Sequence, residues 1–272
     1  MPSAIPSAVP KKPRLAVFKF ASCDGCQLQV LDAQDSLLAI AERVEIAHFP
    51  EARSQSLAGP YDIGLVEGSI STPADIARIQ EIRRECRFLV TIGACATAGG
   101  IQALRNWCRI DEVVGSVYAS PVYVESLAQS TPISEHVPVD FELRGCPIDT
   151  GQLVELITAV VIGRQPRVPR HSVCVECKEA GTVCVTVAHG IACLGPATQA
   201  GCGAICPAHG RECFGCYGPA EQPNLVSLTG FYEHRGTPRP HLARLVRSFN
   251  AWAPDFRHEG DRLEHGTGAD SP

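Results

Sequence analysis

The chain has 272 residues, with 24 Lys or Arg against 29 Asp or Glu and a formal net charge of −5. This small negative charge, with no basic run longer than Lys11-Lys12, argues against nucleic acid or an anionic membrane surface as a partner. No stretch approaches the roughly 20 apolar residues of a membrane helix, and residues 1–13 lack the apolar core of a secretory signal. We therefore expect a cytoplasmic protein with no membrane insertion.

Fourteen cysteines are the most unusual part of the composition. The reducing pool of the cytoplasm keeps thiols free, so metal ligation explains this count better than disulfides do. Eight of the cysteines lie between Cys174 and Cys216, in a stretch with almost no long apolar run. Such a segment cannot bury enough hydrocarbon to fold alone, so a group bound by the thiolates must hold it together.

Residues 14–165 alternate short β-branched runs with longer helical patterns, which predicts an α/β fold with a flavodoxin-like parallel sheet of five strands wound by helices. The predicted strands are Arg14–Phe20, Val44–Phe49, Tyr61–Glu67, Arg87–Ile92 and Asp140–Arg144. The predicted helices between them are Cys26–Arg43, Pro73–Cys86, Ala96–Trp107 and Asp149–Ile162.

The rest of the chain reads as two further parts. Gly163–Arg170, with two prolines among basic residues, is a predicted linker into a small Cys-rich, ferredoxin-like iron–sulfur domain over residues 166–225. Residues 226–272 form a C-terminal extension, in which His241–Trp252 has the pattern of one amphipathic helix. The last residues are rich in Gly, Asp, Glu and His, which predicts a disordered end.

Four cysteines of the first domain follow predicted strands. Cys23 and Cys26 come after the first strand, Cys95 after the fourth and Cys146 after the fifth. The carboxyl ends of the strands of an open α/β sheet form one edge, so these four thiolates should meet there. Four thiolates suit a Zn²⁺ ion or a [4Fe–4S] cluster by count. One C-x-x-C pair with two distant single cysteines, each beside Gly or Pro, favours the cluster over zinc, which usually takes two tight pairs.

Three more residues of this domain are interpreted separately. Cys86 and Cys108 do not follow the carboxyl end of a strand, and a single cysteine is more often a buried small apolar residue than a ligand, so both are predicted to be packing residues. Glu67 shares the predicted ligand edge. Its carboxylate is a candidate proton relay or subunit contact beside the metal group, and an ordinary solvated loop position is an equally good interpretation.

The eight later cysteines divide into two sets of four. They are Cys174, Cys177, Cys184, Cys193, Cys202, Cys206, Cys213 and Cys216. Cys206 precedes a proline, as in bacterial ferredoxins, whose fourth ligand binds the other cluster. By that rule one set is Cys174, Cys177, Cys184 and Cys216, and the other is Cys193, Cys202, Cys206 and Cys213. His171 has ligand spacing too, but eight cysteines already satisfy two clusters, so we place it beside the ligands or on the surface.

Several runs resemble one known family. They are SCDGCQ at 22–27, TIGACATAGGIQALRN at 91–106, RGCPID at 144–149, CLGPATQAGCGAICP at 193–207 and CFGCYGP at 213–219. Together they resemble the small subunit of [NiFe] hydrogenases over residues 14–220. The likeness is greatest to the cytoplasmic group that couples hydrogen to NADP, coenzyme F420 or sulfur, including sulfhydrogenase delta subunits.

The resemblance implies an electron-transfer subunit with three [4Fe–4S] clusters. Residues matching Cys23, Cys26, Cys95 and Cys146 hold the proximal cluster, which faces the Ni–Fe site of a separate large subunit. The C-terminal cysteines hold the medial and distal clusters, which lead to a further subunit, expected here to be a flavin and iron–sulfur diaphorase linked to NAD(P). No catalytic residue is then expected in this chain.

Two alternatives remain at this point. A zinc-stabilised interaction module explains the number of cysteines but not their positions at strand ends. A 20 kDa-like iron–sulfur subunit of a quinone oxidoreductase is the second. That respiratory relative has adjacent cysteines in place of C23-D-G-C26 and lacks the second cluster domain, so both features argue against it.

Overall fold

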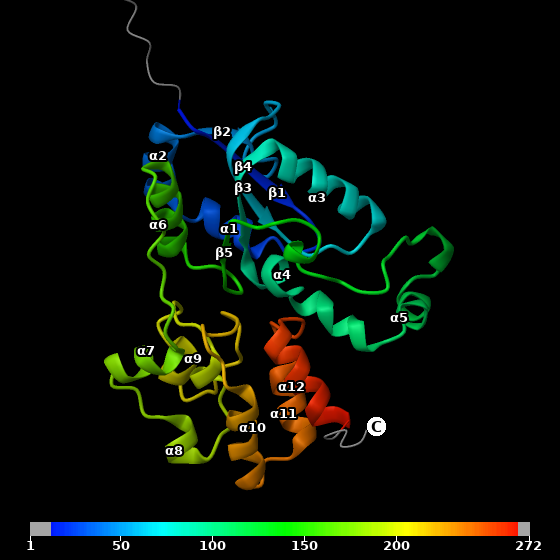
Figure 1. Cartoon of the computed structure of the whole chain (residues 1–272), viewed down its shortest axis with the longest axis vertical. Coiled ribbons are helices and arrows are strands. Elements are labelled where there is room, and N and C mark those ends of the chain that lie inside the picture. Colours follow the sequence, from blue (N-terminus) through cyan, green and yellow to red (C-terminus); the bar gives the residue numbers. More distant parts are fainter. Residues whose placement is uncertain (1–11, 266–272) are drawn as a thin grey trace, which may run out of the picture.

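The computed structural model describes residues 12–265, and its upper half in Figure 1 is a five-stranded parallel sheet. The strands pair in the order β2-β1-β3-β4-β5, which is the flavodoxin-like order, so the predicted fold class is confirmed. Their bounds are Arg14–Lys19 for β1, Glu45–His48 for β2, Tyr61–Glu67 for β3, Cys86–Ile92 for β4 and Phe141–Leu143 for β5. Every predicted strand is present, and its ends lie within a few residues of the predicted ends.

Helices cover both faces of this sheet. On one face α1 (Gly25–Leu31), α2 (Gln34–Arg43) and α6 (Thr150–Val161) pack Val30, Ile40 and Leu156 against the strands. On the other face α3 (Pro73–Glu85) contributes Ile79 and Ile82. Thr72 begins α3 with a capping box, in which its side chain and that of Asp75 each accept the other's backbone N–H. The spacing of apolar residues along each helix therefore determines which side of the helix packs on the sheet.

Two predicted helices are interrupted. The stretch predicted as one helix over Cys26–Arg43 is the pair α1 and α2, because Gln34, the first residue of α2, adopts a left-handed φ of 43°. The stretch predicted over Ala96–Trp107 is the short α4 (Gly93–Ala98) followed by a 3-10 helix (Ile101–Trp107). Gly99 and Gly100, with φ of 74° and 62°, separate these two pieces. Glycine adopts this left-handed conformation at little cost, so the pair ends the helix.

The lower half of Figure 1 contains the Cys-rich segment and the C-terminal helices. The Cys-rich segment forms three short helices, α7 (Val173–Glu179), α8 (Val185–His189) and α9 (Ile205–Ala208). Three longer ones follow: α10 (Leu225–His234), α11 (Arg239–Val246) and α12 (Pro254–His265). The helix predicted over His241–Trp252 is therefore wrong at its end, since α11 stops at Val246. The predicted disordered end falls beyond His265, outside the described residues. The remaining elements are α5 (Ile110–Val117) and the 3-10 turns Pro121–Tyr123, Ile133–Glu135 and Gly195–Ala197.

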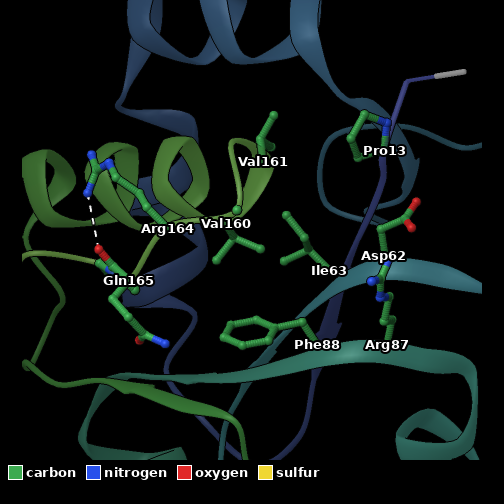
Figure 2. Close-up of a pocket in the computed structure, with 11 residues that line it drawn as sticks. Pro13, Asp62, Ile63, Arg87, Phe88, Val160, Val161, Arg164 and Gln165 are labelled. Atoms are coloured by element: carbon green, nitrogen blue, oxygen red, sulfur yellow. Dashed lines mark hydrogen bonds between the residues drawn. The ribbon is translucent and has the colours of Figure 1, made fainter. Parts of the chain in front are cut away.

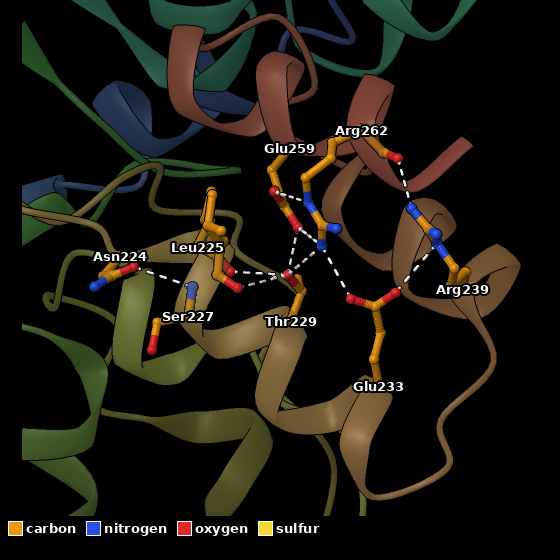
Figure 3. A network of polar contacts seen from close by, with 9 residues as sticks. Asn224, Leu225, Ser227, Thr229, Glu233, Arg239, Glu259 and Arg262 are labelled. Atoms are coloured by element: carbon orange, nitrogen blue, oxygen red, sulfur yellow. Dashed lines mark hydrogen bonds and ion pairs between the residues drawn. The ribbon is translucent and has the colours of Figure 1, made fainter. Parts of the chain in front are cut away.

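A buried ionic network joins the C-terminal helices (Figure 3). Glu259 on α12 is fully buried, and Arg262 of the same helix donates to its carboxylate. Arg262 also bonds Glu233 on α10 at 3.0 Å, and Thr229 donates its hydroxyl to Glu259. These carboxylates raise the pKa of Arg262 above its ordinary value. A buried carboxylate is costly unless it is paired, so the network fixes how α10 and α12 pack.

The C-terminal helices also touch the sheet domain. The indole N–H of Trp107 donates to Asp261 on α12 at 2.9 Å, and the indole N–H of Trp252 donates to Glu135 at 2.8 Å. Ala98 of α4 belongs to the apolar cluster formed by α10, α11 and α12. The last helices thus pack on the segment that follows β4. Within residues 12–265 no helix has the length and apolar character needed to cross a membrane.

Candidate metal centre

The four cysteines predicted at strand ends occupy one edge of the sheet. Cys23 lies in the loop after β1 and Cys26 in the first turn of α1, while Cys95 sits on α4 directly after β4. Cys146 follows β5. All strands run in the same direction, so their carboxyl ends deliver these residues to the same place. Besides burial, other thiols of the group raise the pKa of Cys26, Cys95 and Cys146, which places these residues near one another.

Two polar contacts hold the loops of this edge together. The backbone N–H of Cys26 donates to the Glu67 carboxylate at 3.0 Å, which ties α1 to the end of β3. The backbone N–H of Ala94 donates to the carbonyl oxygen of Gly145 at 2.8 Å, which ties the Cys95 loop to the Cys146 loop. Glu67 is 2% exposed, so the solvated loop position is wrong and the carboxylate belongs to the thiol edge. Sequence segments more than 40 residues apart are thereby fixed beside one another.

The electrostatics of this edge suit a bound cationic group. Burial, followed by the neighbouring thiols of Cys146 and Cys23, raises the pKa of the Cys95 thiol to about 12. Burial and the Glu67 charge likewise raise the pKa of Cys26. Buried thiols of this kind become thiolates together only when a positive centre binds among them. The donor set therefore fits an iron–sulfur cluster.

Two glycines leave space beside these sulfurs. A Cβ on Gly93 would overlap the Sγ of Cys26, and a Cβ on Gly100 would lie 2.5 Å from the Sγ of Cys95. Both residues also have positive φ, of 83° and 62°, which L side chains rarely adopt. Only glycine therefore keeps both the backbone turn and the thiol positions.

The eight later cysteines also gather in space. Cys174 has Cys193, Cys177 and Cys184 as its neighbouring thiols, and with burial they raise its pKa to about 11. Gly195 lies against the Sγ atoms of both Cys174 and Cys193, since a Cβ there would be 3.4 Å from each. The neighbours of Cys216 are different. Burial, followed by the thiols of Cys202, Cys146 and Cys206, raises its pKa to about 12.

Cys213 lies between these groups. Its backbone N–H donates to the Sγ of Cys193 at 3.2 Å, and its own thiol neighbours Cys193 and Cys216. Cys146 of the sheet domain and Cys216 are neighbours as well. The three groups of thiols therefore form a continuous series from the sheet edge into the Cys-rich segment.

Polar side chains that sequence reasoning missed hold the cysteine loops. The buried Tyr232 hydroxyl accepts the Cys193 N–H and donates to the Cys193 carbonyl, both at 3.0 Å. Glu176 accepts the N–H groups of Gly201 and Ala204 at 2.8 and 3.1 Å. The position of Glu176 between two cysteines in C174-V-E-C177 is the only sequence signal for it, and Tyr232 has none.

The remaining predicted residues lie apart from the thiol groups or at their margin. Cys86 is buried beneath Gly64, as predicted for a packing residue. Cys108 is exposed, so its predicted packing role is wrong, because the 3-10 helix that precedes it carries it to the surface. His171 is exposed, and its Nδ1 lies 3.3 Å from the carbonyl oxygen of Ser172.

A separate cleft of about 470 Å³ opens at the other end of the sheet (Figure 2). It is lined by Pro13, Asp62 and Phe88 near the starts of strands and by Val160 and Arg164 at the end of α6. No thiol lines it, so the metal centre is not in this cavity. Within residues 12–265 no three His, Cys, Asp or Glu side chains are arranged around a single metal ion.

Relatives of the chain carry hydrogenase names. It is 34% identical to sulfhydrogenase 2 subunit delta of Pyrococcus furiosus, over 88% of this chain and 100% of the relative. It is 31% identical to a chain in the crystal structure of an NAD⁺-reducing [NiFe]-hydrogenase, over 58% of this chain and 96% of that one, with a TM-score of 0.55. This chain belongs to the family of [NiFe] hydrogenase small subunits.

Other relatives of this small subunit agree. The family described as the NADH ubiquinone oxidoreductase 20 kDa subunit matches residues 23–160, which is the part that contains Cys23, Cys26, Cys95 and Cys146. A subunit of the F420-non-reducing vhu hydrogenase of Methanocaldococcus jannaschii is 30% identical over 77% of this chain and 83% of its own length. The protein is thus an iron–sulfur subunit of a hydrogenase whose catalytic centre lies in a partner chain.

Replacing Gly93 with alanine tests the first group of thiols. The added Cβ would overlap the Cys26 sulfur at a strained φ, so we expect a loss of iron and of about 1–3 kcal/mol in the free energy of unfolding. Gly115→Ala on α5 is the matched control, since no atom lies within 4 Å of its Cβ position. Iron per chain and thermal denaturation measure both effects. Equal iron in the two variants would contradict the role given to Gly93.

Proposed function

We propose that this small subunit carries electrons on three [4Fe–4S] clusters between the Ni–Fe site of a large subunit and a downstream subunit of a cytoplasmic hydrogenase. The continuous series of thiol groups from the sheet edge to the Cys-rich segment is the observation that carries the proposal. When bound, the clusters would supply one-electron transfer at each of three positions. The protein supplies the ligands, their burial and the polar contacts around them.

The first cluster is assigned to Cys23, Cys26, Cys95 and Cys146. Support comes from their common place at the carboxyl edge of the sheet and from the glycines that leave room beside the sulfurs. Cys23 is exposed whereas Cys26 is buried, so this group reaches the surface on one side. That open side is where we place the large subunit.

The division of the other eight cysteines follows their neighbours rather than the ferredoxin rule. We assign Cys174, Cys177, Cys184 and Cys193 to one cluster, and Cys202, Cys206, Cys213 and Cys216 to the other. Cys216 supports this division, since Cys202 and Cys206 are its neighbours, whereas the ferredoxin rule pairs it with Cys174. Because Cys216 also neighbours Cys146, its set lies next to the first cluster. The set that contains the exposed Cys184 would then pass electrons to the downstream subunit.

Glu67 has a separate role in this proposal. Its Oε1 accepts the Cys26 N–H, and the side-chain amide of Gln27 is close enough to favour the charged carboxylate. Burial is the larger effect, and it raises the pKa of this carboxyl group above its ordinary value. A buried carboxyl group with a raised pKa can hold a proton beside the thiols. We assign Glu67 to the contact with the large subunit, where its carboxylate would hold or pass a proton.

The downstream partner is proposed to be a flavin and iron–sulfur subunit linked to NAD(P). Support comes from two relatives: the structure named for an NAD⁺-reducing enzyme, and the delta subunit of an NAD-reducing hydrogenase from Cupriavidus necator, 26% identical over 56% of this chain. Other relatives are named for sulfur or for not reducing F420. The acceptor is therefore decided by the chain that receives the electrons.

Anaerobic purification with its partner chains tests the proposal. We expect a brown complex that contains a large subunit with nickel, and about 12 irons in this chain for three four-iron clusters. The measurements are the visible spectrum, the iron, zinc and nickel content and the identity of the co-purified chains. A colourless chain with stoichiometric zinc would instead establish the zinc-stabilised module.

A further inference from the structure

Glu176 links the two sets of C-terminal cysteines. It lies on α7 between Cys174 and Cys177, and α7 and α9 are neighbours in Figure 1. Its Oε1 accepts the Gly201 N–H at 2.8 Å, and its Oε2 accepts the Ala204 N–H at 3.1 Å. The same Oε2 lies 3.9 Å from the Sγ of Cys202. One carboxylate on the helix of the first set therefore holds the loop of the second.

The loop that Glu176 holds requires outside support. Gly201 and Gly203 have φ of 128° and 65°, and Ala204, which is not glycine, has a left-handed φ of 51°. A non-glycine residue in this region is strained and persists only where its surroundings hold it. The loop has no regular secondary structure, so the N–H groups of Gly201 and Ala204 depend on a side-chain acceptor. Glu176 supplies that acceptor for both.

The loop has a second attachment from the sheet domain. The amide Nε2 of Gln152 on α6 donates to the carbonyl oxygen of Gly201 at 3.0 Å. The neutral amide of Gln152 thus holds a carbonyl group of the loop, and the charged carboxylate of Glu176 holds two of its N–H groups. Because Gln152 still holds the loop when the Glu176 charge is removed, the electrostatic effect of that charge can be measured in an assembled protein.

The charge of Glu176 acts on both sets. Glu176 directly precedes Cys177 on α7, and its Oε2 lies 3.9 Å from the Sγ of Cys202, so its carboxylate lies near a ligand of each set. A fixed negative charge beside a redox group disfavours the addition of an electron in the same way. Both clusters should have lower reduction potentials than they would have without it.

We propose that Glu176 positions the Cys202 loop and lowers the reduction potentials of the two clusters on either side of it. This rests on the proposed function, since it requires that both cysteine sets bind clusters. Glu176 accepts the backbone N–H groups of Gly201 and Ala204 on either side of Cys202 and is a positioning residue, with no contact to a substrate.

The test compares Glu176→Gln with Glu179→Gln in the anaerobic hydrogenase complex. Glu179 ends the same helix and is exposed, so its replacement removes the same charge near Cys177 without a loop contact. In a redox titration followed by EPR, Glu176→Gln should raise the reduced-to-oxidised ratio of the neighbouring clusters about tenfold at a fixed potential, or about 59 mV for one electron. Glu179→Gln should change it much less. Equal shifts in the two variants would overturn the proposal.

Glu176→Asp separates positioning from charge. It keeps the charge but is one methylene shorter, so hydrogen exchange at Gly201 and Ala204 should become faster while the potentials change less than in Glu176→Gln. Wild-type exchange in the aspartate variant would overturn the positioning role, and this comparison remains available if the glutamine variant loses its iron. A wild-type chain without iron would instead refute the proposed function, which distinguishes the two failures.

Discussion

Replacing Cys146 with serine is expected to abolish hydrogen-dependent reduction of downstream acceptors by the intact complex. Cys146 belongs to the first thiol group, and its thiol neighbours Cys23 and Glu67. Serine is a poor iron ligand, so this cluster should be lost or bound weakly. Replacing even the residues that support metal ligands costs about 10- to 100-fold in activity, and replacing a ligand should cost at least as much. The measurements are hydrogen-driven acceptor reduction and iron per chain.

Two controls make the Cys146 result specific. Cys108→Ser removes an exposed thiol outside the three groups, so it should leave iron content and activity unchanged. Reduction of artificial dyes by NAD(P)H, which needs only the flavin subunit, should also survive Cys146→Ser. Equal loss of the hydrogen-driven and flavin-only reactions would show that the variant disrupts the complex and not one electron-transfer step.

Removal of bound iron is expected to unfold the Cys-rich segment while the sheet stays folded. The apolar cluster of this segment contains only Val173, Val185 and Ala204 beside buried cysteines. The sheet, by contrast, has large apolar clusters on both faces. Ligand binding supplies the folding free energy of a segment that cannot fold without it. Residues 171–191 and 201–213 should therefore lose protection against hydrogen exchange in the iron-free chain.

Hydrogen exchange with mass spectrometry, before and after anaerobic chelation, measures this difference. The amides of β1, β3 and β4 serve as the internal reference, since their protection should change little. Helices α10 to α12 should lose part of their protection, because Leu194 and Ala197 of the Cys-rich segment belong to their apolar cluster. Full protection of α7 and α8 in the iron-free chain would contradict the stabilising role of the clusters.

The sheet and its ligand edge were predictable because the strands have local signals. β3 and β4 each contain a short apolar run, as strands covered on both faces should, and Cys95 follows β4 closely. The division of the long predicted helix was not predictable, since Gln34 gives no sign that it adopts a positive φ. The packing of α12 was not predictable either. Its mean hydropathy is low, yet it buries Phe256 and Glu259 against residues far away in the sequence.

The grouping of the eight later cysteines lay beyond sequence reasoning for a related reason. Spacing predicts that they are ligands, but which four share a cluster depends on how loops fold back on one another. Cys216 lies beside Cys146, 70 positions earlier in the chain, and no local pattern relates the two. Glu176 is similar, because its partner amides are 25 and 28 residues away. Contacts of this kind are decided by tertiary packing alone.

The hydrogen bond between Trp107 and Asp261 has a consequence for how the protein is made. Trp107 ends the segment that leads away from Cys95, and Asp261 lies in the last helix of the described chain. During synthesis the sheet emerges from the ribosome well before α12, so the segment after Cys95 lacks this support until α12 has been made. We expect iron delivery to the sheet edge to be most effective once α12 has emerged, and a ribosome-bound chain halted before residue 254 to retain iron poorly.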